Sequence, residues 1–474
     1  MKRWIGTFLN TIAASLAVLM VLSVVIVVAL AMTSAQTGLS SSAIVRSALN
    51  KVQDYIGTGE GRLTRVSENM VSLRGEFSRA FFALEQRVQT LEQQVGAGYP
   101  PAMPQKTGGF IRAQLQAPPL AAPPKAAFGG AISEDMLRRD PINSPPTIKV
   151  KASNTPDVCY SGCRYQTLRA AYRDVRAGDT ITLAPGFYTE CLVVKKSIAI
   201  VGLKGPNGER AEFTAQCRGK GAFVVQTDQF ELRGVAIRDV SVRDNNGACV
   251  RLDPQTGTVR VSDIVCSNSQ NGILGSARKA IFIDSSLFVG NGGAGRAHAI
   301  YVQSTPELVV RNSIIQSTKG AGHTLKSGAE RTIVQNSILA ALDSENSRAI
   351  DLFAGGTLIV TDSVLEQGPN SQNHDVVYFA GEASRINLSA EHIALFENNW
   401  IIYDYKEGRC CRWLAAGKKL APIIFRHNKL VGINSQNLEG LEMEDNLEFE
   451  DRAAAGLPPY TGQLDSLPFP AAWK

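Results

Sequence analysis

The sequence predicts an all-β body, a right-handed parallel β-helix, preceded by an N-terminal transmembrane helix and a coiled-coil stalk. Two observations lead to this fold class. Short apolar segments with the alternation of β-strands recur about every 25 residues through the second half of the chain. The first 150 residues lack this repeat and contain instead one long uncharged run and one heptad-like pattern. The chain of 474 residues is therefore divided into parts of different kinds.

Residues 1–35 are expected to form a cytoplasmic tip and a transmembrane signal anchor. Lys2 and Arg3 precede an uncharged run from Trp4 to Met32, and a helix needs ~20 such residues to cross a bilayer. A cleaved signal peptide is the alternative, but its apolar region usually has only ~7–15 residues. Positive residues stay on the cytoplasmic side. We therefore expect a single-pass protein of the inner membrane, held in the lipid bilayer, with its C-terminal domain in the periplasm.

Eight cysteines fit this placement. They occur as Cys159 and Cys163, Cys191 and Cys217, Cys249 and Cys266, and the adjacent Cys410 and Cys411. An even number in an exported chain predicts disulfides, whose connectivity the sequence leaves open. Zinc is the less favoured reading of such pairs, because no second closely spaced Cys or His pair completes a set of four ligands.

The charge balance argues against nucleic acid as a partner. The chain has 49 basic and 43 acidic residues, a formal net charge of +6, without basic runs interleaved with aromatic residues. An acidic polysaccharide is compatible with this balance. We expect neither a metal nor a cofactor.

Residues 42–96 are expected to form a helical coiled-coil stalk, and residues 97–146 a linker. From Leu63 on, apolar residues follow one another at spacings of three and four, with one stutter between Phe77 and Phe81. This pattern favours a homo-oligomer, a dimer or trimer, over a single amphipathic helix lying on the body. The linker is rich in Pro, Ala and Gly, cannot build a core and should act as a semi-extended spacer.

Residues 147–450 are expected to form the β-helix. The segments "VRVSDIVCSN", "IFIDSSLFVGN", "LVVRNSIIQS", "TIVQNSILAA" and "LIVTDSVLEQ" align Asp263, Ser286, Ser313, Ser337 and Ser363, at steps of 23, 27, 24 and 26 residues. A period near 25 made of short strands indicates a solenoid with one coil per repeat. Leucine-rich repeats are the rival, but no Leu-x-x-Leu-x-Leu pattern recurs. A helix around Leu168 should cap the first coil, and residues 451–474 should form a loosely packed tail over the open end.

A second strand begins 14 residues before each aligned position and carries the candidate site. Stacked apolar side chains must be buried, so the columns that start at Val250 and Leu252 should face the core, and the columns of Ala299 and Tyr301 should face solvent. In this alignment Lys326 takes a place where its neighbours are aliphatic. The strand must therefore end or bulge there, so that the amine reaches solvent or a carboxylate.

Consecutive coils stack ~4.8 Å apart, so polar residues from several repeats gather on one outer face. Such a group suits abstraction of the proton next to a carboxylate, as in uronate lyases and epimerases. Lys326 or Arg348 would neutralise the substrate carboxylate and His323 would remove the proton. Tyr301 would act as the acid. The remaining candidates are His298 and Asp351 for catalysis, and Gln303, Ser327, Arg331, His374 and Asp375 for substrate binding. The expected substrate is an acidic polysaccharide of the cell envelope or an exported one.

Two other functions fit the same pattern. Asp351 and Asp375 lie on adjacent coils, ~8 Å apart by strand geometry, within the ~6.5–9.5 Å of inverting glycoside hydrolases. Asp351 can instead simply pair with Lys326 or Arg348. In the third reading the long face binds a polysaccharide or a partner protein as a scaffold, without catalysis. Dependence of product on His323 would favour an enzyme, and binding without product would favour the scaffold.

Three motifs carry a family resemblance. They are His298 to Tyr301 (His-x-x-Tyr), Gly322 to Ser327 (Gly-His-x-x-Lys-Ser) and Asp351 to Gly356 (Asp-Leu-x-x-Gly-Gly). With them, residues from about 147 to 400 resemble the right-handed parallel β-helix, pectin-lyase-like superfamily, most closely a bacterial group of membrane-anchored β-helix repeat proteins. The resemblance implies the fold. It also points to a superfamily of polysaccharide lyases, hydrolases, esterases and epimerases, although fold analogy alone establishes no activity.

The chain departs from the well-defined enzymes of that superfamily. It has no Asp-Pro-His-Asp as in alginate epimerases, no Asn-Thr-Asp with a following Asp pair as in polygalacturonases, and no acidic cluster like the calcium site of pectate lyases. In the group that it resembles, an Arg usually follows Lys-Ser, whereas this chain has Gly328. If that Arg holds a substrate carboxylate, Arg331 or Arg348 would have to replace it.

Overall fold

The structure is a computed structural model, which describes residues 148, 154–380, 382, 393–405, 412–416, 423–433 and 441–473. All of these belong to one compact unit, Ile111–Lys474. The expected anchor, stalk and linker, together with Cys410 and Cys411, lie outside the described residues. Within the described part of the chain, no helix has the length and apolar character needed to cross a membrane.

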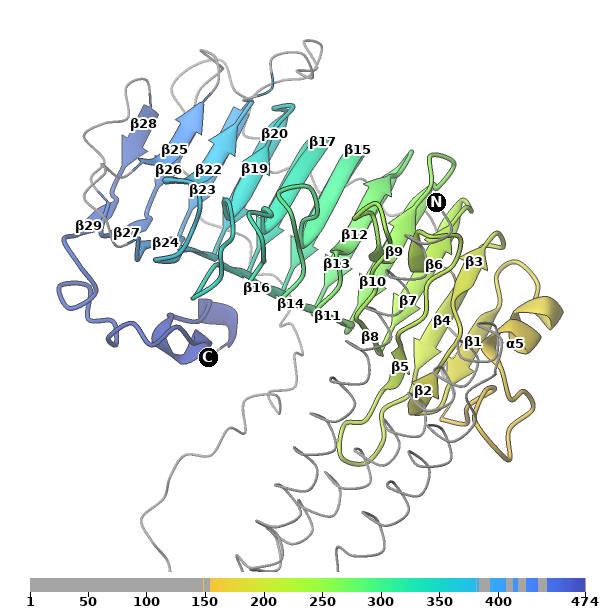
Figure 1. The fold of residues 1–474 in the computed structure, drawn as a ribbon. Coiled ribbons are helices and arrows are strands. Elements are labelled where there is room, and N and C mark those ends of the chain that lie inside the picture. The colour runs from red at the N-terminus through yellow and green to blue at the C-terminus, as the bar shows by residue number, and fades with distance from the viewer. Residues whose placement is uncertain are drawn as a thin grey trace, which may run out of the picture. The chain divides into compact units, whose positions relative to one another are not determined.

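The described residues wind into a solenoid of parallel strands (Figure 1) with three faces, and each coil except the last two gives one described strand to each face. Face 1 comprises β1 (Thr180–Leu183), β4 (Ile198–Gly202), β7 (Gln229–Arg233), β10 (Thr258–Ser262), β13 (Ala280–Asp284), the second parts of β15 (Ile300–Arg311) and β17 (Leu325–Gln335), β20 (Thr357–Thr361), β23 (Ile393–Glu397), β26 (Ile423–Arg426) and β28 (Leu441–Glu444). Face 2 comprises β2 (Gly186–Tyr188), β5 (Ala211–Phe213), β8 (Val235–Arg238), β11 (Val265–Ser267), β14 (Leu287–Val289), β16 (Ile314–Gln316), β18 (Ile338–Ala340), β21 (Val364–Gln367), β24 (Trp400–Tyr403), β27 (Lys429–Val431) and β29 (Leu447–Phe449). Face 3 comprises β3 (Leu192–Val194), β6 (Gly221–Val225), β9 (Ala248–Leu252), β12 (Asn271–Ser276), the first parts of β15 and β17, β19 (Ile350–Leu352), β22 (Asp375–Phe379) and β25 (Arg412–Ala416).

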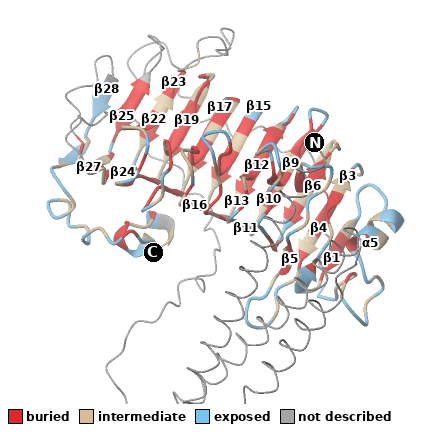
Figure 2. Ribbon diagram, viewed as in Figure 1, coloured by how far each residue is buried: buried red, intermediate tan, exposed pale blue. Residues whose placement is uncertain are grey.

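The core fills the interior of the solenoid, where strand residues alternate between inside and outside. Columns of register partners such as Val250, Ile273 and Ile300 stack through consecutive coils and are fully buried. Figure 2 shows this burial along the strands. Towards the C-terminal coils the core contains packed aromatic rings. The ring centroids of Trp413 and Phe425 are 4.3 Å apart. One continuous core therefore extends from coil to coil.

A ladder of side chains marks the turn between faces 1 and 2. The backbone N–H of Ser286 donates to Oγ of Ser313 at 3.1 Å, and the N–H of Ser313 donates to Oγ of Ser337 at 3.2 Å. This ladder confirms the alignment of the later serines. The first repeat differs by one residue, because Ile264, and not Asp263, donates its N–H to Oγ of Ser286.

The first coil is closed by α5 (Leu168–Asp174), as the sequence predicts. Thr167 caps this helix, since its side chain accepts from the N–H of Ala170 at 3.1 Å, a role for which Thr is a favoured residue. Leu168 and Ala171 are fully buried against the end of the solenoid core.

Six of the cysteines form three disulfides. The pairs are Cys159–Cys163, Cys191–Cys217 and Cys249–Cys266, with Cα–Cα distances of 5.5, 5.5 and 6.3 Å. The structure thus decides a connectivity that the sequence left open. Cys249–Cys266 lies within the core, because both residues are fully buried.

The C-terminal tail packs on the outer side of face 2, rather than loosely over the open end. Its two short helices are η3 (Leu464–Ser466) and η4 (Ala471–Trp473). Leu467 is buried in one cluster with outward residues of face 2 that include Ile338 and Ile402. Tyr460 donates to Oδ1 of Asp343 at 3.1 Å. The physical reason is that the outer side of this face is apolar at these coils and has to be covered.

Glu366 on β21 is a fully buried carboxyl group on this face. Burial raises its pKa to about 8, with repulsion from Asp404 in the same direction, and the N–H of Leu342 and the charge of Arg452 only partly oppose this. The group is therefore mostly protonated at neutral pH. Its ionisation would place a second negative charge beside the Asp404–Arg452 pair.

We expect Glu366→Gln to stabilise the protein at about pH 8 and to leave its stability unchanged at about pH 4. The unfolded carboxyl ionises near ~4.3, whereas the folded one stays protonated up to about 8. The stabilisation that the bound proton gives the folded state is thus complete below the unfolded pKa of ~4.3. It is lost as pH rises through the folded pKa of about 8. The advantage of the variant should grow to several kcal/mol, because each unit of difference between the folded and unfolded pKa corresponds to ~1.4 kcal/mol. Thermal melting at several pH values measures it, and a pH-independent shift would contradict this assignment.

Candidate functional site

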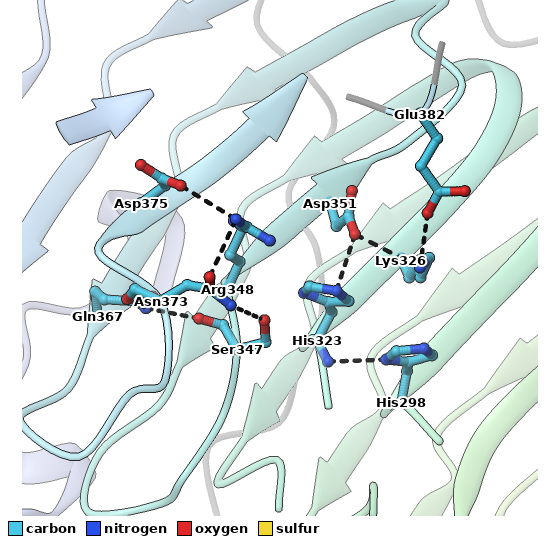
Figure 3. Close-up of polar contacts among 10 residues, drawn as sticks. All are labelled: His298, His323, Lys326, Ser347, Arg348, Asp351, Gln367, Asn373, Asp375 and Glu382. Atoms are coloured by element: carbon cyan, nitrogen blue, oxygen red, sulfur yellow. Dashed lines mark hydrogen bonds and ion pairs between the residues drawn. The ribbon is translucent and has the colours of Figure 1, made fainter. Parts of the chain in front are cut away.

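Eight side chains from four consecutive coils form two columns on the outer side of face 3. The first column consists of direct register partners, Tyr301, Lys326, Asp351 and Tyr378. The second consists of the residues three positions earlier in each coil, His298, His323, Arg348 and Asp375. Figure 3 shows that Asp351 contacts His323 and Lys326 of the preceding coil and that Arg348 contacts Asp375 of the next one. The sequence prediction that polar residues from several repeats lie on one wall is therefore correct in this structure.

The coil that contains Lys326 has a register one residue different from the sequence alignment. Leu325, and not Thr324, pairs with Ile300 and Ile350 and occupies the core position. Lys326 consequently points outward, so the expected strand end or bulge at this residue is not needed. Because strand side chains alternate, a shift of one residue exchanges inside and outside. Leucine at the core position also buries more apolar surface than threonine would.

Two other expectations about outward side chains are wrong. Ser327, a candidate for substrate binding, pairs with Val302 in the inward column. It is fully buried, with its hydroxyl 2.8 Å from that of Thr332. Ala299 and Ala349 are also fully buried in the core cluster, as are the residues that follow them. The chain bends there, so that two successive side chains face inward.

Asp351 is the centre of the outward group. Its Oδ2 lies 2.9 Å from Nε2 of His323 and 3.7 Å from Nζ of Lys326. Lys326 also lies 3.4 Å from Oε1 of Glu382. The side chains of Asp351 and Lys326 are only 5% and 14% exposed. Charges that are so poorly hydrated need partners, and each of these two has one.

His298 supports this group from the preceding coil. Its ring stacks on that of His323, with centroids 5.0 Å apart, and its Nδ1 accepts the backbone N–H of His323 at 2.9 Å. Because Nδ1 accepts, the neutral ring carries its proton on Nε2. Burial, followed by repulsion from His323 and Lys326, holds the pKa of His298 well below its usual value.

We expect the ring of His298 to stay neutral, with its proton on Nε2, as pH falls through ~6.5, where an unperturbed histidine takes up a proton. The unfolded chain takes up a proton near ~6.5 and the folded ring does not, so this group lowers stability as pH falls through that value. Ring ¹⁵N chemical shifts measure the tautomer, and the signal is assigned by its loss in a His298→Gln variant. A protonation midpoint near ~6.5 would show the prediction to be wrong.

His323 and Asp351 form a neutral–anionic pair at neutral pH. Burial lowers the pKa of His323, and the hydrogen bond and charge of Asp351 oppose this only in part. Burial raises the pKa of Asp351, but the hydrogen bond from His323 and the nearby cations outweigh it, so the pKa is lowered overall. The imidazole thus donates from Nε2 to an ionised carboxylate. Nδ1 of His323 is buried and has no hydrogen-bond partner among the described residues.

Arg348 is held on the other side of the group. Its Nη2 lies 3.2 Å from Oδ2 of Asp375 and 3.2 Å from Oδ1 of Asn373, and its guanidinium lies 4.5 Å from the ring centre of Tyr378. An inverting hydrolase needs one carboxyl group that stays protonated to act as the acid. The lowered pKa of Asp351 and the pairing of Asp375 with Arg348 do not favour that chemistry.

A cavity of about 340 Å³ lies beside this group. The side chains and backbone that line it include Tyr301, Gln303, Glu330, Phe353, Gly355 and Gly356. The ammonium of Lys326 stands 5.5 Å from the ring centre of Tyr301 and 5.4 Å from that of Phe353. The cavity thus adjoins the first outward column, and the lysine cation stands near two of the rings that line it.

Comparison with known families agrees with this architecture. A family described as "Right handed beta helix region" matches residues 221–401. These residues form a right-handed β-helix. The right-handed parallel β-helix expected for the body is thereby confirmed. No curated protein matches the chain.

Several solved structures have a chain path similar to that of this protein. An alginate lyase from Paenibacillus sp. is 15% identical, with a TM-score of 0.40 over 60% of this chain and 96% of the lyase. A pectin methylesterase from Erwinia chrysanthemi is 12% identical, with a TM-score of 0.33 over 67% of this chain and 99% of the esterase. A pectate lyase is 15% identical, with a TM-score of 0.32 over 60% and 74% of the two chains. Similarity at this level transfers no activity.

Two expected substrate-binding residues, Arg331 and His374, are not among the residues that line the cavity. Nη1 of Arg331 lies 2.7 Å from Oε1 of Glu307, its register partner on face 1. His374 packs its ring against Tyr405, with centroids 5.0 Å apart. Because Arg331 lies on a different face, it cannot take the place of the Arg that usually follows Lys-Ser. Among the described residues, no group of three or more His, Cys, Asp or Glu side chains is placed to hold a metal ion.

Several contributors to the site were not expected from the sequence, among them Tyr378, Glu330, Phe353, Asn373 and Glu382. Phe353 occupies a variable position of the Asp-Leu-x-x-Gly-Gly motif, so the motif itself was an available signal. Gly328 is explained by the same ring, since a Cβ at this position would lie 2.5 Å from Cζ of Phe353 and 2.4 Å from the carbonyl oxygen of Gln303. Asn373 and Glu382 lie in connections between strands, where no periodicity marks them.

Proposed function

We propose that this β-helix acts on an acidic polysaccharide by abstracting the proton next to a uronate carboxylate, as a polysaccharide lyase. The observation that carries the proposal is the position of the Lys326 ammonium, 5.5 Å from the ring centre of Tyr301 at the border of a cavity that Tyr301 lines. A cation and a phenol placed together are what the reaction needs to neutralise the substrate carboxylate and to move a proton.

The roles follow from Tyr301, which lines the cavity, and from Lys326, whose ammonium stands near the Tyr301 ring. Lys326 neutralises the substrate carboxylate and so stabilises the carbanion formed beside it. Tyr301 carries the proton from C5 of the uronate to the leaving oxygen at C4, while the bond from C4 to that oxygen breaks and a C4–C5 double bond forms. One residue thus completes an elimination on one side of the sugar. His323 has a positioning role, because its Nε2 is engaged by Asp351 and its Nδ1 is buried. The His323–Asp351 pair holds Lys326 in place.

The test follows unsaturated product in the full chain. Polymers of mannuronate, guluronate, galacturonate and glucuronate are each incubated with wild type, with His323→Ala and with Lys279→Ala. Lys279 is a matched control, since it also pairs with a carboxylate, at 3.0 Å from Asp228, but on the exposed surface. Ultraviolet absorbance from one polymer that disappears in His323→Ala and persists in Lys279→Ala supports the lyase. Deuterium uptake from solvent without chain cleavage would indicate an epimerase instead.

A non-catalytic scaffold is the second candidate, and one observation favours it. The side chains of His323 and Asp351 are only 10% and 5% exposed and are hydrogen-bonded to each other, as in a purely structural network. In that case a polysaccharide would be retained on a column of the immobilised protein, and no polymer would give unsaturated product or deuterium uptake.

We also propose the placement that the N-terminal sequence predicts. Residues 1–35 would anchor the chain in the inner membrane, residues 42–96 would join copies into an oligomer, and the β-helix would face the periplasm. The three disulfides support this placement, because such bonds persist in oxidising compartments and are rare in the cytosol. Alkylation of free thiols before and after reduction, on protein taken directly from membranes, tests whether the bonds exist in the cell.

A further inference from the structure

The outer side of face 1 carries a row of apolar side chains. In β15, Leu308 and Val310 belong to the core, whereas Val309 between them points outward. The same outward place is apolar in six consecutive coils. We call these residues the outer stripe: Phe282, Val309, Ile333, Ile359, Leu395 and Ile424. A contiguous apolar row of this kind is not left in contact with water without a reason.

The outer stripe is buried although it points away from the core. Val309 is 2% exposed and Ile359 is 6% exposed. On face 2, burial of the outward residues is explained by the C-terminal tail, whose side chains pack on them. On face 1, the described apolar side chain that packs against the buried members is Phe282, which belongs to the stripe itself. The stripe therefore needs a cover from elsewhere in the chain.

We propose that residues 111–147 lie along the outer stripe and cover it. Residues 111–147 precede the first described residue of the β-helix and fall in the same unit of the chain, Ile111–Lys474. Ile148, directly after the segment, is only 8% exposed. The described chain that follows the segment therefore starts at a buried residue.

The composition and length of the segment fit the stripe. Apolar residues are spread along it, namely Leu115, Leu120, Phe128, Ile132, Met136, Leu137 and Ile142. Its prolines favour an extended conformation of ~3.1 Å per residue that needs no partner strand. The stripe spans five coil steps of ~4.8 Å, or ~24 Å, which roughly eight such residues cover. The segment is several times longer, so it can reach the stripe from the first coil and follow it.

This arrangement is independent of the proposed activity and changes how the body is held. Residues 97–146 would not act as one free spacer, because most of them would be bound to the β-helix. Only residues 97–110 would remain between the stalk and the body. The position of the β-helix above the membrane would then be set by a short connection.

Photo-crosslinking in the full chain tests the proposal. Ile333, and in a second variant the less buried Phe282, is replaced by p-benzoylphenylalanine, and the cross-linked peptides are identified by mass spectrometry after irradiation and digestion. A mixture of ¹⁵N-labelled and unlabelled chains separates links within one chain from links between copies. The same amino acid in place of Tyr160, which is 97% exposed, is the control.

We expect links within one chain from position 333 or 282 to peptides of residues 111–147, and none to this segment from position 160. Links to residues 1–110, to another part of the β-helix only, or to a second copy would overturn the proposal. So would the absence of any link from both stripe positions. The second variant protects the test if the bulky group at position 333 prevents folding.

Discussion

Lys326→Met is expected to lower kcat/KM on the responsive polyuronate about 100- to 1000-fold, the usual loss when one preorganised charge at a developing anion is removed. Methionine keeps the length of the side chain and its packing near Phe353, so the local shape is retained. Asp351 keeps its 2.9 Å contact with His323 and is not left as an unpaired buried charge. Initial rates of unsaturated-product formation measure the effect.

Tyr301→Phe gives the companion measurement at the same border of the cavity. Removal of a group that transfers protons typically costs ~10²–10⁴ in rate, and we expect this loss mainly in kcat, because the ring and its packing remain. Lys279→Met serves as the control for Lys326→Met, as an exposed lysine on another face. Activity of Lys326→Met within about threefold of wild type, with an unchanged circular dichroism spectrum, would remove the lysine from the mechanism.

Arg452→Ala is expected to detach the C-terminal tail from face 2. Arg452 binds both carboxylate oxygens of Asp404, at 2.6 and 2.5 Å, and donates to the carbonyl oxygens of Ser466 and Pro458. The side chain of Asp404 is 9% exposed, and the loss of one partner from such a buried pair costs ~3–5 kcal/mol. Amide hydrogen exchange and limited proteolysis of residues 453–473 measure the release.

Arg278→Ala is the matched control for this variant. Its ion pair with Asp228 is exposed, with side chains 58% and 45% accessible, and such pairs contribute ~0–1 kcal/mol. Tail amides that remain as protected in Arg452→Ala as in Arg278→Ala would show that apolar packing alone holds the tail. The packing of Leu467 and Trp473 in the face 2 cluster would then be the next target.

The wall that carries the candidate site was predictable because a solenoid converts sequence period into spatial neighbourhood. Once the repeat was recognised, His298, His323 and Arg348 had to follow one another on consecutive coils. Which side chains of these coils face outward was less predictable. Either Thr324 or Leu325 could take the core position of a plausible strand. The residue that packs better against the coils before and after it takes that position. That choice decided the orientation of Lys326 and Ser327.

Residues outside the strands escaped prediction for a different reason. Glu382 lies beyond β22 and reaches Lys326 across 56 positions of sequence, and no periodicity relates the two. Arg331 looked like a neighbour of Lys326 because only four residues separate them, but β17 bends between faces 3 and 1, so the two side chains point to different surroundings. Distance along the chain is a poor guide wherever a strand turns a corner.

By itself, the sequence determined the coil architecture, the cap at the first coil and the grouping of four coils' polar residues on one wall, because these depend only on period and on the burial of apolar side chains. The tertiary structure alone decided the register at Leu325, the pairing of the cysteines, the cavity beside Tyr301 and the course of the C-terminal tail. Each of these depends on contacts between segments that no repeat connects, and such contacts are selected by packing in three dimensions.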